Sequence, residues 1–85
     1  MTGTVEYSAG AAKGRDRMPS GHRQRLMRTL DAIAAGETPA NADVKPLQGR
    51  PGRLRLRIGD WRAVYRIEGS ILFVTAVTTR GDAYK

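Results

Sequence analysis

Arginines dominate the residues that could do chemistry, and they cluster toward the end of the chain. Residues 53–58 alternate arginine with leucine or isoleucine at every step. Successive side chains of a strand point to opposite faces of a sheet, so this alternation predicts one arginine face and one aliphatic face. We expect up to six arginines on the outer face, away from the core: Arg53, Arg55, Arg57, Arg62, Arg66 and Arg80.

An arginine-rich sheet face is suited to binding phosphate groups. A guanidinium group is planar and presents several N–H donors, so it matches phosphate oxygens better than an ammonium group does. Preorganised cations can also stabilise negative charge that develops in a transition state. The alternative interpretation of the same pattern is a solvated strand face that binds nothing.

The charge balance favours a polyanionic partner. The 85 residues include 15 Lys+Arg and 8 Asp+Glu, which gives a formal net charge of +7. An excess of this size in a small chain indicates nucleic acid, an acidic protein or a membrane surface as partner.

Several other classes of protein are disfavoured by composition. The chain has no cysteine and a single histidine, His22, so we expect no disulfide, no metal and no cofactor. The longest uncharged apolar run, residues 71–77, is too short to cross a membrane. We see no secretion signal and expect a cytoplasmic protein without a membrane partner.

Periodicity and turn residues predict the elements that carry these arginines. The chain is expected to form one α+β domain, residues 1–85, in the order β-α-α-β-β-β. Two helices would pack on one face of a small, mainly antiparallel four-stranded sheet. Residues 37–43 are interpreted as a polar connector. The predicted elements are a strand at 4–7, helices at 9–18 and 21–35, and strands at 53–58, 61–67 and 71–79.

The first helix is predicted to be weak. It contains Gly10 and Gly14, each less favourable than alanine in a helix by about 1 kcal/mol. Ser8 is a suitable N-cap, and Pro19 should end the helix.

Alternation also predicts which side chains of the last two strands reach the core. Ala63, Tyr65 and Ile67 are expected in the core, because the opposite phase would bury two arginines. The last strand is apolar on both faces. If Arg80 is to continue the arginine face, the outer-face residues of this strand are Leu72, Val74, Ala76 and Thr78.

Three motifs resemble the RelE/ParE superfamily of toxins from toxin–antitoxin systems. Residues 44–49 (VKPLQG) are similar to the family's lead-in to the sheet, and residues 55–65 (RLRIGDWRAVY) to its arginine-rich hairpin. Residues 80–84 (RGDAY) are similar to its closing motif, although Thr79 stands where relatives often have histidine. With a looser match near the N-terminus, the resemblance spans nearly the whole chain and implies two helices on one face of an antiparallel sheet.

The resemblance also implies activity and partners. RelE-like members are metal-independent endoribonucleases that cut mRNA on the ribosome, whereas ParE-like members poison DNA gyrase and lack the nuclease residues. We expect the RelE-like branch, with an acidic cognate antitoxin, mRNA and the ribosome as partners. The alternatives are a ParE-like gyrase poison and a non-catalytic nucleic-acid-binding module. The implied catalytic residues are Arg55, Arg62, Arg80 and Tyr84, and the expected RNA-binding residues are Arg53, Arg57, Arg66 and Lys45.

The reaction implied by the resemblance is attack of an RNA 2′-hydroxyl on the adjacent phosphorus, with a 5′-hydroxyl leaving. Arginine is a poor base because its pKa exceeds about 12, and His22 is expected on the helix side of the sheet. Tyr84 remains as a candidate for proton transfer, since surrounding arginines favour its phenolate. It could instead stack on a base or pack the tail onto the sheet.

Overall fold

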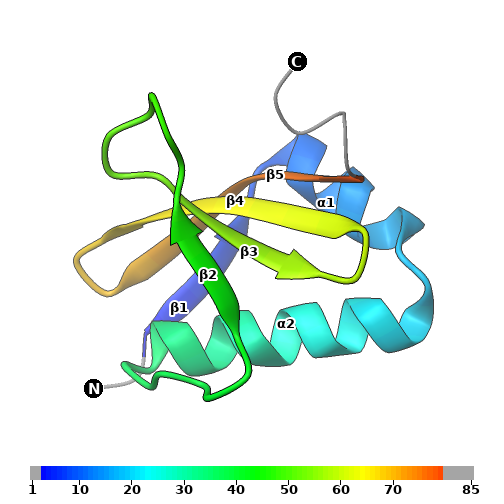
Figure 1. Ribbon diagram of the computed structural model, residues 1–85, viewed down its shortest axis with the longest axis horizontal. Helices are drawn as coiled ribbons and strands as arrows, with labels where there is room; N and C mark the ends of the chain where they lie inside the picture. The colour runs from blue at the N-terminus through cyan, green and yellow to red at the C-terminus, as the bar shows by residue number, and fades with distance from the viewer. Residues whose placement is uncertain (1–2, 80–85) are drawn as a thin grey trace.

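Two helices and one sheet form the two layers of the protein (Figure 1). A computed structural model describes residues 3–79. Helix α2 runs along one side of the sheet (Figure 1). Helix α1 packs against β5, the last strand in the chain (Figure 1). The elements are β1 (Thr4–Tyr7), α1 (Ala9–Arg17), α2 (Ser20–Ala34), β2 (Asp43–Pro46), β3 (Leu54–Ile58), β4 (Trp61–Glu68) and β5 (Ile71–Thr79).

The sheet has five strands where the sequence predicted four. Their order is β1-β5-β4-β3-β2; β1 is parallel to β5, and the other pairs are antiparallel. The extra strand is β2, which begins inside the predicted connector at Asp43 and pairs Val44 with Leu56. A strand of four residues that ends in proline has almost no pattern of its own. Its existence depends on pairing with β3 across the loop of residues 47–53, at the edge of the sheet, where proline is tolerated.

A bulge in β5 separates a first part, whose faces are opposite to those predicted, from a second part in which Ala76 and Thr78 lie on the outer face as predicted. Val64 pairs with Ala76 and Tyr65 pairs with Val74, so Thr75 is an extra residue opposite β4. The Thr75 hydroxyl donates a hydrogen bond of 3.2 Å to the Val64 carbonyl. The expectation that Leu72 and Val74 lie on the outer face is therefore wrong. Both are buried in the core, and after the bulge Val77 joins them.

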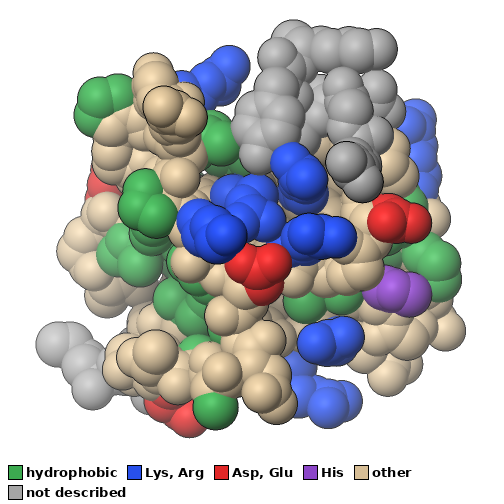
Figure 2. Space-filling view, in the orientation of Figure 1, with side chains coloured by type: hydrophobic (Ala, Val, Ile, Leu, Met, Phe, Trp, Pro, Cys, Tyr) green, Lys and Arg blue, Asp and Glu red, His purple; other side chains and the backbone are tan. Residues whose placement is uncertain are grey.

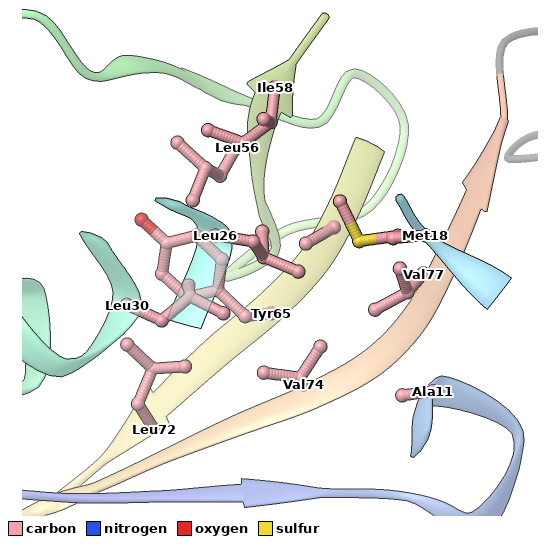
Figure 3. Close-up of a cluster of buried hydrophobic side chains, with 11 residues drawn as sticks. Ala11, Met18, Leu26, Leu30, Leu56, Ile58, Tyr65, Leu72, Val74 and Val77 are labelled. Carbon is pink, nitrogen blue, oxygen red and sulfur yellow. The ribbon is translucent and has the colours of Figure 1, made fainter. Parts of the chain in front are cut away.

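The core fills the space between the helices and the sheet (Figure 3). Leu26 and Leu30 of α2 lie against Tyr65, which is buried as predicted and whose pKa is raised by that burial. Ala63 is buried too, but Ile67 is 49% exposed and the prediction for it is wrong. Ile67 lies beside Gly3, Gly36 and Gly69, which have no side chains to cover it.

Helix α1 is held close to β5 through Gly14. The Ser8 side chain accepts a hydrogen bond from the Ala11 amide at 3.1 Å, as expected of the N-cap. Gly14 is buried, and a Cβ atom there would collide with the carbonyl oxygen of Val77. Gly10 faces open space. The two glycines therefore differ in effect. Gly10 only weakens the helix, whereas Gly14 allows the helix to pack closely on β5.

Alanine substitutions should separate these two effects. Gly14→Ala forces α1 away from Val77, and we expect a loss of about 1–3 kcal/mol in the free energy of unfolding. Gly10→Ala adds a methyl group where nothing lies within 4 Å, and it should stabilise the protein by up to about 1 kcal/mol. Urea denaturation of both variants measures the difference. Equal effects of the two substitutions would contradict the close packing of α1 on β5.

Candidate functional site

A hollow lies on the outer face of the sheet, meaning the face opposite the helices. Its volume is about 540 Å³. Lys and Arg side chains gather in the middle of the view in Figure 2, with an acidic side chain beside them. We call the hollow on the outer face of the sheet the basic hollow. The residues that line it are Lys45, Pro46, Leu47, Gln48, Arg55, Arg57 and Arg62.

Three neighbouring strands bring these cations together. Arg57 of β3 pairs directly with Arg62 of β4, and Arg55 of β3 pairs with Lys45 of β2. Directly paired residues project to the same face of a sheet, so four positive side chains are neighbours. Like charges in such positions destabilise a sheet, so the arrangement is suited to binding an anion.

Arg55 is the buried member of this group. It is only 9% exposed, and its aliphatic stem lies opposite Val64, which is buried as well. Its Nη2 atom is 3.4 Å from Oδ1 of Asp43, which lies two residues before Lys45 on β2. A carboxylate next to a nearly buried guanidinium offsets part of the free energy that burial of the charge costs.

Arg57 and Arg62 lie at the solvent side of the hollow. Arg57 is exposed, and its Nε donates a hydrogen bond of 3.1 Å to the carbonyl of Gly59. Gly59 has a φ of +59° in the turn between β3 and β4, a conformation that favours glycine. The turn therefore helps to hold the Arg57 side chain. Arg62 is half-buried and lines the hollow from β4.

Some predicted residues lie elsewhere. Arg66 is about 13 Å beyond Arg62 along β4, at ~3.3 Å per residue. Its guanidinium lies over the ring of Phe73, 5.1 Å from the centroid, and its Nε is 2.9 Å from Oε1 of Glu68. Arg53 comes just before β3 and does not line the hollow. Arg80, predicted on the arginine face and in the closing motif, and Tyr84 of that motif lie outside the described residues.

Asp43 is a charged residue of the site that was not predicted from the sequence. Asp43 was assigned to a polar connector, and its place beside Arg55 follows from the pairing of β2 with β3. One signal was the alternation Asp43-Val44-Lys45, in which Val44 packs against the core between two polar residues. The other was the position of Asp43 directly before the VKPLQG motif, where the family pattern has Asp or Asn.

The chemistry available in the basic hollow is that of fixed positive charge. Within residues 3–79, no group of three or more His, Cys, Asp and Glu side chains could hold a metal ion. None of the helices formed by these residues is long and apolar enough to span a membrane. His22 lies against the Gly59 turn and is not among the lining residues. The hollow can bind a phosphate group and stabilise charge that develops on it.

Solved structures with the same fold include toxins in toxin–antitoxin complexes. The RelE–RelB complex of Pyrococcus horikoshii OT3 matches with a TM-score of 0.76 and 25% identity over 98% of this chain and 100% of that chain. The RelB–RelE complex of Methanococcus jannaschii has a TM-score of 0.76 and 18% identity, over 92% and 93%. The DinJ–YafQ complex of E. coli has a TM-score of 0.75 and 21% identity, and both chains are covered completely.

The family comparison agrees with this fold. A search of curated protein sequences finds no significant match. A family model described as the ParE toxin of the type II toxin–antitoxin system parDE matches residues 5–84. This match covers the helices, all three strands that form the basic hollow and the closing motif, so the chain belongs to the ParE toxin family of type II toxin–antitoxin systems.

Proposed function

We propose that this toxin is a RelE-like endoribonuclease that cleaves mRNA on the ribosome and so inhibits translation. The observation that carries the proposal is the convergence of Lys45, Arg55, Arg57 and Arg62 on one hollow. Four cations around a space of this size can surround a single phosphate group. An RNA backbone presents phosphates to which arginine donates in a bidentate manner.

The proposed reaction needs no group beyond side chains and the RNA itself. The 2′-hydroxyl attacks the adjacent phosphorus, the bond to the 5′-oxygen breaks, and a proton moves from the attacking to the leaving oxygen. Arg55 and Arg62 stabilise the negative charge of the pentavalent phosphorane. One preorganised donor of this kind contributes about a hundredfold to a thousandfold in rate.

The closing motif completes the proposed site. Arg80 and Tyr84 occupy the positions of the RelE-like arginine and tyrosine, so we assign them to phosphate binding and to proton transfer or base stacking. Arg53 and Arg66 lie outside the hollow and would contact neighbouring nucleotides. Arg66 is suited to this role because a guanidinium can stack on a base, as it lies over the ring of Phe73 here.

The proposed partners follow from the relatives and from the charge. RelE and YafQ relatives were solved in complex with RelB and DinJ antitoxins. A toxin with a net charge of +7 is complementary to an acidic antitoxin. The same charge attracts mRNA and ribosomal RNA, so we place the protein in the cytoplasm.

The second candidate function is poisoning of DNA gyrase. It is favoured by the family description, which names the ParE toxin. Under this function the basic hollow would bind an acidic surface of the target without cleaving anything. The two candidates differ in whether translated mRNA is cut.

An Arg62→Ala variant tests the nuclease function. Arg62 lines the hollow and points away from the core, so we expect a folded protein whose cleavage rate falls by about a hundredfold or more. Expression in growing cells measures toxicity, and primer extension after in vitro translation maps the cuts. Arg28→Ala is the matched control, since Arg28 is an exposed arginine of α2. It should leave cleavage unchanged.

Two outcomes would contradict the assignment. A folded Arg62→Ala protein with wild-type cleavage would remove Arg62 from the site. Intact message together with inhibited supercoiling by the wild-type protein would favour the gyrase target instead.

Substitution of Tyr84 separates its two proposed roles. If the hydroxyl transfers a proton, Tyr84→Phe should slow cleavage by about a hundredfold or more. If the ring only stacks on a base, Tyr84→Phe should be close to wild type while Tyr84→Ala is impaired. Single-turnover cleavage of translated message measures both variants, and wild-type rates in both would exclude Tyr84 from the reaction.

A further inference from the structure

We propose that Asp43 is a positioning residue that holds the Arg55 guanidinium in place at the floor of the basic hollow. The proposal deepens the function above and rests on it only for the identity of the bound phosphate. It assigns a role to Asp43, which the arginine pattern does not include and which directly precedes the VKPLQG motif.

The Arg55 side chain is nearly buried at the floor of the basic hollow. It is only 11% exposed, whereas the Asp43 side chain is 43% exposed. Within residues 3–79, the hydrogen bond from Nη2 to Oδ1 of Asp43 is the one that the Arg55 side chain makes. A guanidinium has five N–H donors, so most of the donors of Arg55 remain for a ligand in the hollow that it lines.

Electrostatic repulsion from neighbouring cations acts on the Arg55 guanidinium. Arg55 is surrounded on its own face by Lys45, Arg57 and Arg62, and all of them repel it. Without an attractive partner, a long flexible side chain in this position would turn out toward water. Asp43 supplies the attraction from β2, on the side of Arg55 away from β4. The carboxylate thus fixes which donors of Arg55 face the hollow.

The contact between Arg55 and Asp43 is too weak to compete strongly with a ligand for the donors of Arg55. The Nη2–Oδ1 distance of 3.4 Å is longer than the 2.7–2.9 Å that is typical of a strong charge-assisted hydrogen bond. The contact involves a single pair of atoms rather than a bidentate pair. Asp43 therefore orients Arg55 without occupying its remaining donors, and a phosphate can bind to them.

Asp43→Asn tests this role with little change in shape. Loss of the carboxylate charge releases Arg55, so we expect kcat for cleavage of translated message to fall tenfold or more. RNA affinity should be equal or higher, because the site loses a negative charge and keeps its four cations. Asp43→Glu keeps the charge and should recover part of the lost kcat. Glu37→Gln, which removes a carboxylate from an exposed loop residue, is the matched control and should be unchanged.

A second measurement reports on Arg55 directly and needs no activity. Rotation of a guanidinium about its Nε–Cζ bond is slowed when a carboxylate holds one Nη group. NMR spectra of the isolated full-length chain should show separate Nη signals for Arg55 in the wild type and averaged signals in Asp43→Asn. Binding of a short non-cleavable RNA, followed in the same samples, gives the affinity.

The outcomes separate the positioning role from its alternatives. Reduced kcat with retained affinity and averaged Arg55 signals supports the proposal. Unchanged kcat and unchanged signals overturn it, and so does a lower melting temperature with normal kcat, which is what a purely structural ion pair would produce. If the wild-type protein cleaves no RNA, the proposed function fails. The NMR comparison and RNA binding then still decide whether Asp43 positions Arg55.

Discussion

The pairing of β3 with β4 is the interaction on which the rest of the structure depends. One ladder of backbone hydrogen bonds sets both faces of the sheet, because a shift by one residue would exchange them. In the observed register, Leu56 lies opposite Ala63 in the core, and the adjacent pair places Arg57 opposite Arg62 on the outer face. The hydrophobic core and the basic hollow are therefore consequences of the same alignment.

This alignment has an electrostatic cost that the core must offset. Arg57 and Arg62 face each other directly, and Lys45 and Arg55 do the same on the next pair of strands. Like charges in such positions oppose sheet formation. They stay together because the other face of these strands carries Leu56 and Ala63, which are fully buried. Asp43, which pairs with Arg57 and lies 3.4 Å from Arg55, offsets part of this repulsion, and a bound anion would offset more of it.

The bulge at Thr75 shows how backbone geometry changes the meaning of a sequence pattern. Strict alternation along β5 cannot place Val74 and Val77 on the same face, yet both lie in the core. The extra residue shifts the phase at that point, with the Thr75 hydroxyl bonded to the carbonyl of Val64. A run that is apolar on both faces carries no signal for a bulge. For this reason the predicted faces of β5 were wrong before the bulge, at Leu72 and Val74, while those of β3 were right.

The sequence by itself determined the two layers, the order of the predicted elements and the arginine face, because strong periodicity and turn residues are local properties. It also identified Arg55, Arg57 and Arg62 as neighbours, since they belong to one hairpin. Only the tertiary structure decided which of the outer cations converge. The pairing of β2 with β3 places Lys45 and Asp43 at the site, whereas Arg53 and Arg66 lie outside the hollow. The absence of a side chain at Gly14 allows α1 to pack closely on β5. These features depend on contacts between different elements of the fold, and the pattern within one segment does not encode such contacts.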